Sequence, residues 1–263
     1  GLPLEGTPET VKRLGPSDAR GLYARVFTAS NTLFFATGDL QAVDVMRRVE
    51  EAFGDWPAGA VPESGSPPPT PAPAERRIAV VDRPDLGQAQ IVIGHEGISR
   101  TDPERLSASL MNTVLGGGSF SSRLTTSVRA EAGLTYSIYS RFSMRRHPGP
   151  FAVLTSTRVP EVRRVVDLVL SELSRVRSDP PSPEEVANAQ SQRVGRFALG
   201  LETSSAVAVA LVDLDVHGLS EDSLDTLRGR LRALSAEDTA RVARDLVHPE
   251  RAAILVVGPA DAI

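Results

Sequence analysis

Residues 234–259, LSAEDTARVARDLVHPERAAILVVGP, combine a capped helix, a short turn and an apolar strand that ends in glycine. The same pattern occurs in LGPSDARGLYARVFTASNTLFFATGD, residues 14–39, at a constant offset of 220 and without a gap. Asp18 aligns with Asp238, the strand LFFAT with AILVV, and Gly38 with Gly258. We interpret the two stretches as copies of one helix–strand unit, each closing a domain of the same kind.

The spacing of the two copies predicts the domain organisation. A repeat of about 220 residues that ends near residue 39 would begin before residue 1, so we expect residues 1–60 to be the tail of a preceding domain. Residues 61–74, VPESGSPPPTPAPA, contain six prolines and predict an extended linker. Residues 75–263 then form a complete second domain.

The second domain alternates short β-branched runs with helical patterns. Residues 76–82 and 89–97 read as strands, and residues 135–142 and 149–157 as a hairpin. Apolar positions from Val162 to Val176 keep helical spacing, while Ser182 and Glu185 form a capping box that opens another long helix. The pattern predicts an α+β fold, an antiparallel-rich sheet with helices packed on one face.

Composition excludes several classes of function. The chain has 29 basic and 33 acidic residues and a net charge of -4, which disfavours nucleic acid as a partner. It has no cysteine, and its longest apolar runs are too short to span a membrane. We expect a soluble protein; the residues leave its compartment open, and the bacterial cytoplasm or periplasm is our expectation.

The stretch LGGGSFSSRLTTSVRAEAGLTY, residues 115–136, carries the candidate site. Its glycines fit neither a phosphate-binding loop nor a dinucleotide fingerprint, and they follow a predicted helix. They could simply end that helix, or they could expose backbone groups that pair with an extended peptide. Arg129 and Tyr136 could likewise be ordinary surface residues.

The sequence gives little evidence for metal-dependent catalysis by this chain or for a serine nucleophile. The four histidines are scattered, and no HxxEH or HxxxH pair is present, so the chain carries no expected metal ligands. A GxSxG nucleophile elbow is also absent, and the serines of residues 119–122 have no indicated base.

Residues 114–140, VLGGGSFSSRLTTSVRAEAGLTYSIYS, resemble the second domain of the M16 (pitrilysin-like) zinc peptidases, with RAEAGLTY as the most specific piece. The resemblance implies paired α+β domains of the LuxS/MPP-like type, with zinc held by an HxxEH helix in the first domain. The corresponding helix here, ERLSASLMNTVL, has small and apolar residues instead. The resemblance therefore implies that this chain alone is inactive, with no cofactor of its own and Zn on a missing domain or partner.

The resemblance also implies roles for individual residues. Arg129 and Tyr136 would bind the substrate peptide opposite the zinc and stabilise charge that develops during cleavage. The segment Gly116, Gly117, Gly118, Ser119 and Phe120 would form a substrate-binding loop.

These expectations define two functions. The first is the non-catalytic half or subunit of a zinc endopeptidase, whose partners are an HxxEH-bearing M16 domain or subunit and an extended peptide substrate. The alternative is a catalytically inert assembly module with the same fold, similar to the core proteins of respiratory complexes. The presence of both Arg129 and Tyr136 favours the first.

Overall fold

The computed structural model describes residues 3–40, 44–62, 65, 73–118 and 120–263. The chain divides into two compact units, Gly1–Pro69 and Thr70–Ile263, referred to below as unit 1 and unit 2. The predicted linker, residues 61–74, lies largely outside the described residues.

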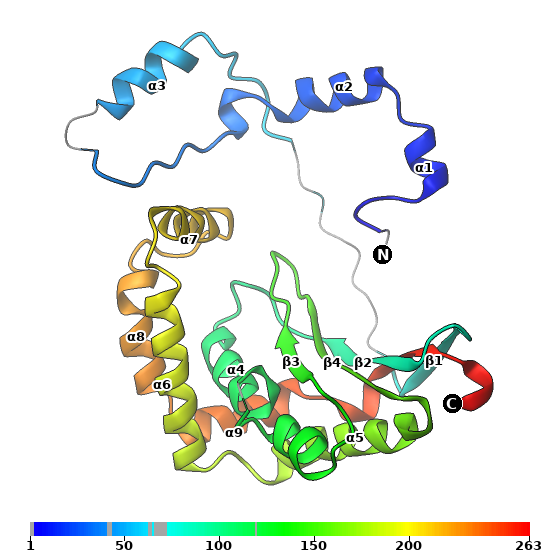
Figure 1. The fold of residues 1–263 in the computed structure, drawn as a ribbon. Helices are drawn as coiled ribbons and strands as arrows, with labels where there is room; N and C mark the ends of the chain where they lie inside the picture. The colour runs from blue at the N-terminus through cyan, green and yellow to red at the C-terminus, as the bar shows by residue number, and fades with distance from the viewer. Residues whose placement is uncertain (1–2, 41–43, 63–64, 66–72, 119) are drawn as a thin grey trace. The chain divides into compact units, whose positions relative to one another are not determined.

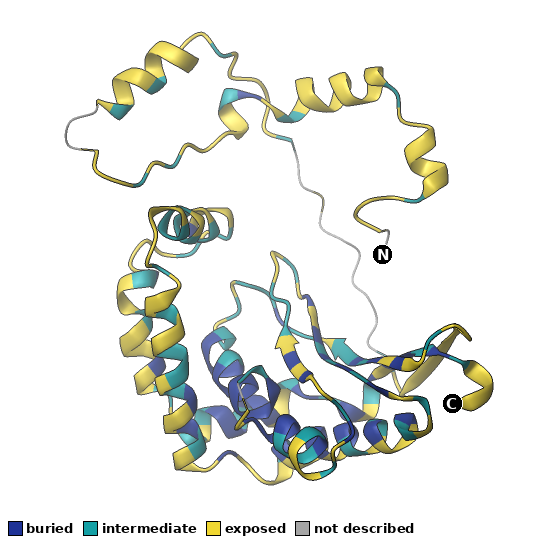
Figure 2. Ribbon diagram, viewed as in Figure 1, coloured by how far each residue is buried: buried dark blue, intermediate teal, exposed yellow. Residues whose placement is uncertain are grey.

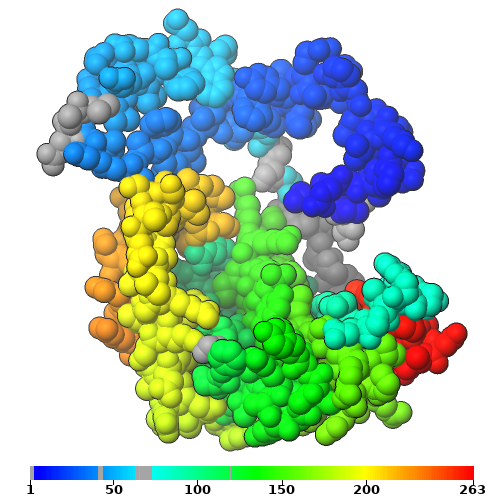
Figure 3. Space-filling model, in the orientation of Figure 1, coloured from blue at the N-terminus to red at the C-terminus, as the bar shows by residue number. Residues whose placement is uncertain are grey.

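Unit 2 is built on one five-stranded sheet with strand order β1-β5-β2-β4-β3 (Figure 1). Its strands are β1 (Arg77–Asp82), β2 (Gln88–Glu96), β3 (Ile138–Phe142), β4 (Pro150–Arg158) and β5 (Ala253–Gly258). Only the β1–β5 pair is parallel, and β2, β3 and β4 pair antiparallel with their neighbours. Strand β1 therefore lies beside the C-terminal segment of the chain (Figure 3).

Helices cover one face of the sheet. The helices packed there are α4 (Arg105–Asn112), α5 (Val162–Ser178) and α9 (Ala236–Leu246). Helices α6 (Pro183–Leu199) and α8 (Ser223–Ala233) pack on α4 to one side of the sheet, and α7 (Ser204–Val216) follows α6 (Figure 1). Alternate residues of β2, β4 and β5 are buried, as expected for strands with one covered face. Ile91, Val153 and Ile254 of the sheet share one core with α5 and α9 (Figure 2).

This architecture confirms the predicted α+β fold. Each predicted strand of the second domain is present, and the predicted hairpin is the antiparallel β3–β4 pair. The apolar stripe of α5 faces the core through Val165, Val169 and Leu173. The Ser182 hydroxyl accepts a hydrogen bond from the Glu185 amide at 3.2 Å, which confirms the capping box of α6.

Unit 1 contains α1 (Pro8–Lys12), α2 (Pro16–Val26), the 3-10 turn η1 (Ala29–Asn31) and α3 (Val45–Phe53). The predicted helix is present as α2, but the strand predicted at residues 33–37 does not form in the described part of the chain. A strand is stabilised by hydrogen bonds to neighbouring strands, and the described part of unit 1 contains no other strand.

Among the described residues, no single helix is long and apolar enough to cross a membrane. Helices α6 and α7 reach that length and composition only as a pair bent by 112°.

Candidate functional site

The candidate site lies on two π-helices and the turn that follows them. The first, η2 (Thr113–Gly117), continues α4, and the second, η3 (Thr125–Glu131), carries Arg129. Wide helical turns of this kind occur often at functional sites. They replace regular α-helical geometry at Thr113–Gly117 and Thr125–Glu131.

The glycines of η2 are required for close packing. A Cβ atom on Gly116 would lie 2.6 Å from the Ser140 hydroxyl, and one on Gly117 would lie 2.3 Å from the Asn112 amide nitrogen. A Cβ on Gly118 would lie 2.6 Å from a backbone oxygen of η2. All three positions therefore exclude a side chain, whatever further role the segment has.

Exposure differs along this segment. Gly116 is buried, Gly117 and Gly118 are half-buried, and the exposed Phe120 follows them. Ser119 lies outside the described residues. The accessible backbone of the predicted substrate loop is therefore at Gly117 and beyond, not at Gly116.

A buried polar pair joins η2 to the sheet. The Asn112 side-chain amide donates to the backbone oxygen of Ser140 at 3.0 Å, and the Ser140 hydroxyl donates back to Asn112 at 2.6 Å. Both residues are buried, so the two hydrogen bonds hold the end of α4 against β3.

Arg129 and Tyr136 lie together. The guanidinium carbon of Arg129 is 5.2 Å from the centre of the Tyr136 ring and 4.6 Å from that of the Phe120 ring. Phe120 is 73% exposed and Tyr136 86% exposed, so the arginine and both rings form a surface cluster, the Phe120–Arg129–Tyr136 cluster. No carboxylate among the described residues is ion-paired with Arg129, which leaves its N–H groups free of a competing charge.

A glycine turn brings Tyr136 back to Arg129. Gly133 follows η3 with φ +65, a conformation that favours glycine, and its amide donates to the Arg129 oxygen at 3.2 Å. The Thr135 hydroxyl then donates to the Ser156 oxygen of β4 at 2.8 Å. These contacts hold the segment before Tyr136 on the sheet, beside an open hollow of about 320 Å³ that Thr135, Tyr136 and Ser156 help to line.

The sequence analysis missed the buried cation that supports this region. Arg123 is 8% exposed and makes two 2.8 Å hydrogen bonds to the carboxylate of Glu185. It also donates to the backbone oxygens of Asp179 and Pro180. Arg123 holds the pKa of Glu185 at about 2, well below its usual range. The chain after the glycines is thereby fixed to the start of α6.

A second polar contact lies at the far end of β2. His95 accepts a hydrogen bond from the His248 backbone amide through Nε2 at 3.0 Å, and its Nδ1 lies 2.7 Å from the Glu96 oxygen. Burial lowers the pKa of His95 because the charged imidazolium loses its hydration. This histidine, with a neutral ring nitrogen that accepts the bond, therefore joins β2 to the turn between α9 and β5.

The residues present do not fit a zinc ion. Among the described residues, no three His, Cys, Asp or Glu side chains are grouped to hold a metal. Helix α4 presents buried residues such as Ser107, Ala108 and Met111, none of which is a usual zinc ligand. No step of catalysis is assigned to a metal on this chain.

Comparison with known proteins shows which family the chain resembles. The family model described as the peptidase M16 inactive domain matches residues 13–193. An uncharacterized zinc protease of Streptomyces coelicolor is 30% identical over 264 residues, covering 98% of this chain. A non-peptidase homolog of Helicobacter pylori is 25% identical over 238 residues, covering 89% of this chain and 53% of that protein.

Among solved structures, a peptidase M16 inactive domain from Pseudomonas fluorescens matches with a TM-score of 0.88 and 23% identity, over 97% of this chain and 60% of that one. The chain spans 57% of the length of the Streptomyces protein. Since the family model covers more than half of the 263 residues and the fold matches as well, the chain belongs to the peptidase M16 family and carries that family's inactive domain.

Proposed function

We propose that this chain is the non-catalytic half of an M16-type zinc endopeptidase and binds the substrate peptide through Arg129 and Tyr136. The zinc is held by an HxxEH-bearing M16 domain, on the same polypeptide or on a separate one. The observation that carries the proposal is the Phe120–Arg129–Tyr136 cluster, which gathers two side-chain donors on an exposed surface.

The chemistry of the two side chains suits a peptide carbonyl. The guanidinium of Arg129 and the phenol of Tyr136 both donate hydrogen bonds, and the guanidinium carbon lies 5.2 Å from the centre of the Tyr136 ring, so both donors belong to one surface. Donors fixed in advance stabilise negative charge that develops on the carbonyl oxygen during cleavage. Closure of a partner domain over the cluster would exclude water and strengthen both interactions.

The glycine segment supplies the second part of the proposed peptide site. Gly116 is buried, so we assign contact with the peptide backbone to Gly117, Gly118 and Phe120, with Ser119 between them. Glycine allows a peptide to approach the backbone closely because no side chain intervenes.

Single substitutions in the complete peptidase test this proposal. Arg129→Ala should lower kcat/KM for a peptide by about 10² to 10³-fold, the usual effect of losing one such donor. Tyr136→Phe should reduce it as well, with the zinc content unchanged in both variants. Arg141→Ala and Tyr139→Phe are matched controls, since both residues are exposed on the neighbouring β3. Equal turnover in the Arg129 and Arg141 variants would remove the proposed role.

A second candidate is an inert assembly module, and it is supported by the similarity to the Helicobacter pylori non-peptidase homolog. The two candidates differ when the complete protein is assayed with unfolded peptides, with and without a chelator. Cleavage that the chelator abolishes supports the peptidase. Inactivity that is the same with and without chelator supports the assembly module.

Domain boundaries and location belong to the same proposal. Residues 1–60 belong to one M16-like domain, and residues 75–263 belong to a second one. The protein acts in the bacterial cytoplasm or periplasm. Fractionation of the source cells, followed by immunoblotting, tests the location.

A further inference from the structure

Helix α6 carries an arginine on the face that it buries. Val186 and Ala189 of this face pack with Leu110 and Val114 in a small apolar core. Arg193 follows Val186 by seven residues, which is about two helical turns, so it lies on the same face. Arg193 is half-buried at a position where the stripe predicts an apolar residue.

Two further arginines lie near Arg193 on other parts of unit 2. Arg105 begins α4, and Arg100 lies in the segment before that helix; both are half-buried. Burial lowers the pKa of Arg105 and of Arg193, and in both the positive charge of Arg100 lowers it further. Arg100 is therefore close enough to act on the other two, and these three residues form the arginine cluster.

The charges of the arginine cluster are only partly balanced. Arg100 donates to the Asp213 carboxylate of α7 at 2.5 and 3.2 Å, and the Nδ1 atom of His217 lies 3.3 Å from the same carboxylate. In the described part of the chain, no carboxylate is ion-paired with Arg105 or Arg193, and neither guanidinium has a hydrogen-bond partner. Two of the three cations are thus unpaired there.

Arg123 provides the contrast. This buried arginine is bound by the Glu185 carboxylate, which raises its pKa. The pKa of Arg193 shifts the other way, because the residue is partly removed from water and the charges of Arg196 and Arg100 that act on it are also positive. A partly buried cation without a partner costs free energy in the folded protein, and a bound anion offsets that cost.

The arginine cluster adjoins the glycine segment of the proposed peptide site. Arg196, one helical turn after Arg193, donates through Nη1 to the Gly117 backbone oxygen at 3.4 Å. Gly117 is the first residue to which we assign contact with the peptide backbone. A peptide held at Gly117 therefore places a side chain within reach of the arginine cluster.

We propose that the arginine cluster is an oxyanion site that binds the carboxylate of an acidic side chain in the peptide substrate. The proposal rests on the proposed function, since it names the substrate class of the same site. Each guanidinium presents a planar fork of N–H donors that matches the two oxygens of a carboxylate. A phosphate group offers the same kind of acceptor, so free phosphate is a second source of the anion; the contact between Arg196 and Gly117 favours the peptide.

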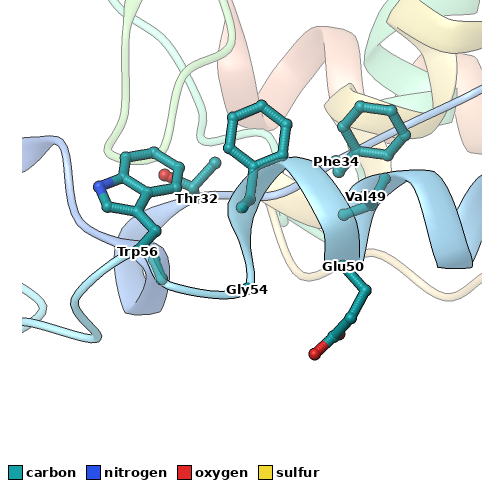
Figure 4. A pocket seen from close by; sticks show the side chains of 8 residues that line it. Thr32, Phe34, Val49, Glu50, Gly54 and Trp56 are labelled. Atoms are coloured by element: carbon teal, nitrogen blue, oxygen red, sulfur yellow. The ribbon is translucent and has the colours of Figure 1, made fainter.

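The hollow in unit 1 does not provide such a site. Phe34, Val49, Phe53 and Trp56 line this open hollow of about 250 Å³ (Figure 4). Of the described residues that line it, Glu50 alone is charged, and it points away from the hollow in this view. Its described wall is therefore mainly apolar and contributes no cation.

Peptide pairs that differ only by Glu or Gln at one position test the proposal in the complete peptidase. When the substituted position is moved along the peptide, kcat/KM should be at least about 10-fold higher for Glu than for Gln at one position, because hydrogen bonds to charged groups are stronger than neutral ones. Arg193→Met should bring this Glu/Gln ratio close to 1. Equal values for Glu and Gln at every position would overturn the proposal.

Further variants separate binding from a structural role. Arg163→Met is the matched control and should keep the Glu/Gln ratio, since Arg163 is an exposed residue of α5. Arg105→Met should lower the ratio as Arg193→Met does, and it decides the outcome if Arg193→Met does not fold. Arg193→Met should leave the free energy of unfolding in urea unchanged or raise it, because it removes an unpaired charge that other arginines repel. A lower free energy of unfolding with an unchanged ratio would show that Arg193 is structural.

Inorganic phosphate separates this proposal from the peptidase function. Calorimetric titration of the complete protein with phosphate, at constant ionic strength, should detect binding that Arg193→Met abolishes and Arg163→Met keeps. Binding that persists in Arg193→Met would overturn the oxyanion site. Phosphate binding that depends on Arg193, without any preference for Glu peptides, would overturn the peptide carboxylate in favour of the free anion.

The same peptides decide the outcome even if the complete protein cleaves none of them. Their affinities, measured by fluorescence anisotropy, then take the place of kcat/KM. A preference for Glu that Arg193→Met removes supports the oxyanion site while the peptidase function fails. Equal affinities of the Glu and Gln peptides at every position overturn the oxyanion site as a peptide site.

Discussion

The Arg123–Glu185 ion pair gives the sharpest test of how the candidate site is supported. We consider Glu185→Gln, which removes the charge but keeps an oxygen that can still cap α6. The matched control is Glu184→Gln, because Glu184 is an exposed residue in the same first turn of α6. Both variants lose one carboxylate near the positive end of the helix, so the helix dipole contributes to both alike.

The magnitude follows from the pKa of Glu185. Arg123 lowers it from 4.5 to about 2, which corresponds to an interaction of roughly 3 kcal/mol. About a third of the Glu185 side chain is exposed, so solvent screens part of this interaction. We expect Glu185→Gln to lower the free energy of unfolding by about 2 kcal/mol at pH 7, against about 0.5 kcal/mol or less for Glu184→Gln.

The pH dependence has a defined sign. The pKa of Glu185 is lower in the folded state, so its contribution is complete above about pH 4.5 and is lost as the pH falls towards 2. Urea unfolding followed by circular dichroism at pH 7, 5 and 3.5 measures both effects. The gap between Glu185→Gln and the unsubstituted protein should narrow below pH 4.5. Equal stability of the two variants at pH 7 would refute the reasoning.

Three further predictions concern other parts of unit 2. Gly117→Ala should lower the free energy of unfolding measured in urea by about 2 kcal/mol, since the new Cβ lies 2.3 Å from the side-chain amide nitrogen of Asn112. Gly195→Ala is the control: no neighbouring atom lies within 4 Å of the Cβ it would add, so it should instead stabilise α6 by up to about 1 kcal/mol. Burial lowers the pKa of His95 in the folded state, so the stability that its neutral form provides is complete above about pH 6.5 and declines below it. The free energy of unfolding should therefore change less between pH 7 and pH 5 in His95→Gln than in the unsubstituted protein. Phe120→Ala should lower peptide kcat/KM by up to about 5-fold in the complete peptidase, because a cation–π contact at an exposed site contributes about 0.5 to 1 kcal/mol; an unchanged value would show that the ring does not support the arginine.

The sequence predicted the main residues of the candidate site, but not the side-chain contacts that hold them in place. Arg129 and Tyr136 were singled out through the family resemblance, and the structure places them together. The hydrogen bonds between Asn112 and Ser140 join residues 28 positions apart, and no local sequence pattern predicts such a pair. Position 120 was predicted only as part of a loop, and its contact with Arg129 came from the structure.

The sequence by itself determined the elements and their order. Helical spacing in α5, the capping box of α6 and the repeat that aligns Pro16–Val26 with Ala236–Leu246 all act within a few residues, so they can be read from neighbouring positions. The tertiary structure decided which elements find partners. Residues 253–258 form an inner strand because β1 and β2 supply hydrogen bonds on both sides, and residues 33–38, with a similar sequence, form none in the described chain. Strand formation depends on pairing across long sequence separations, and burial of a charge such as Arg123 depends on a carboxylate 62 residues away, so neither follows from local sequence alone.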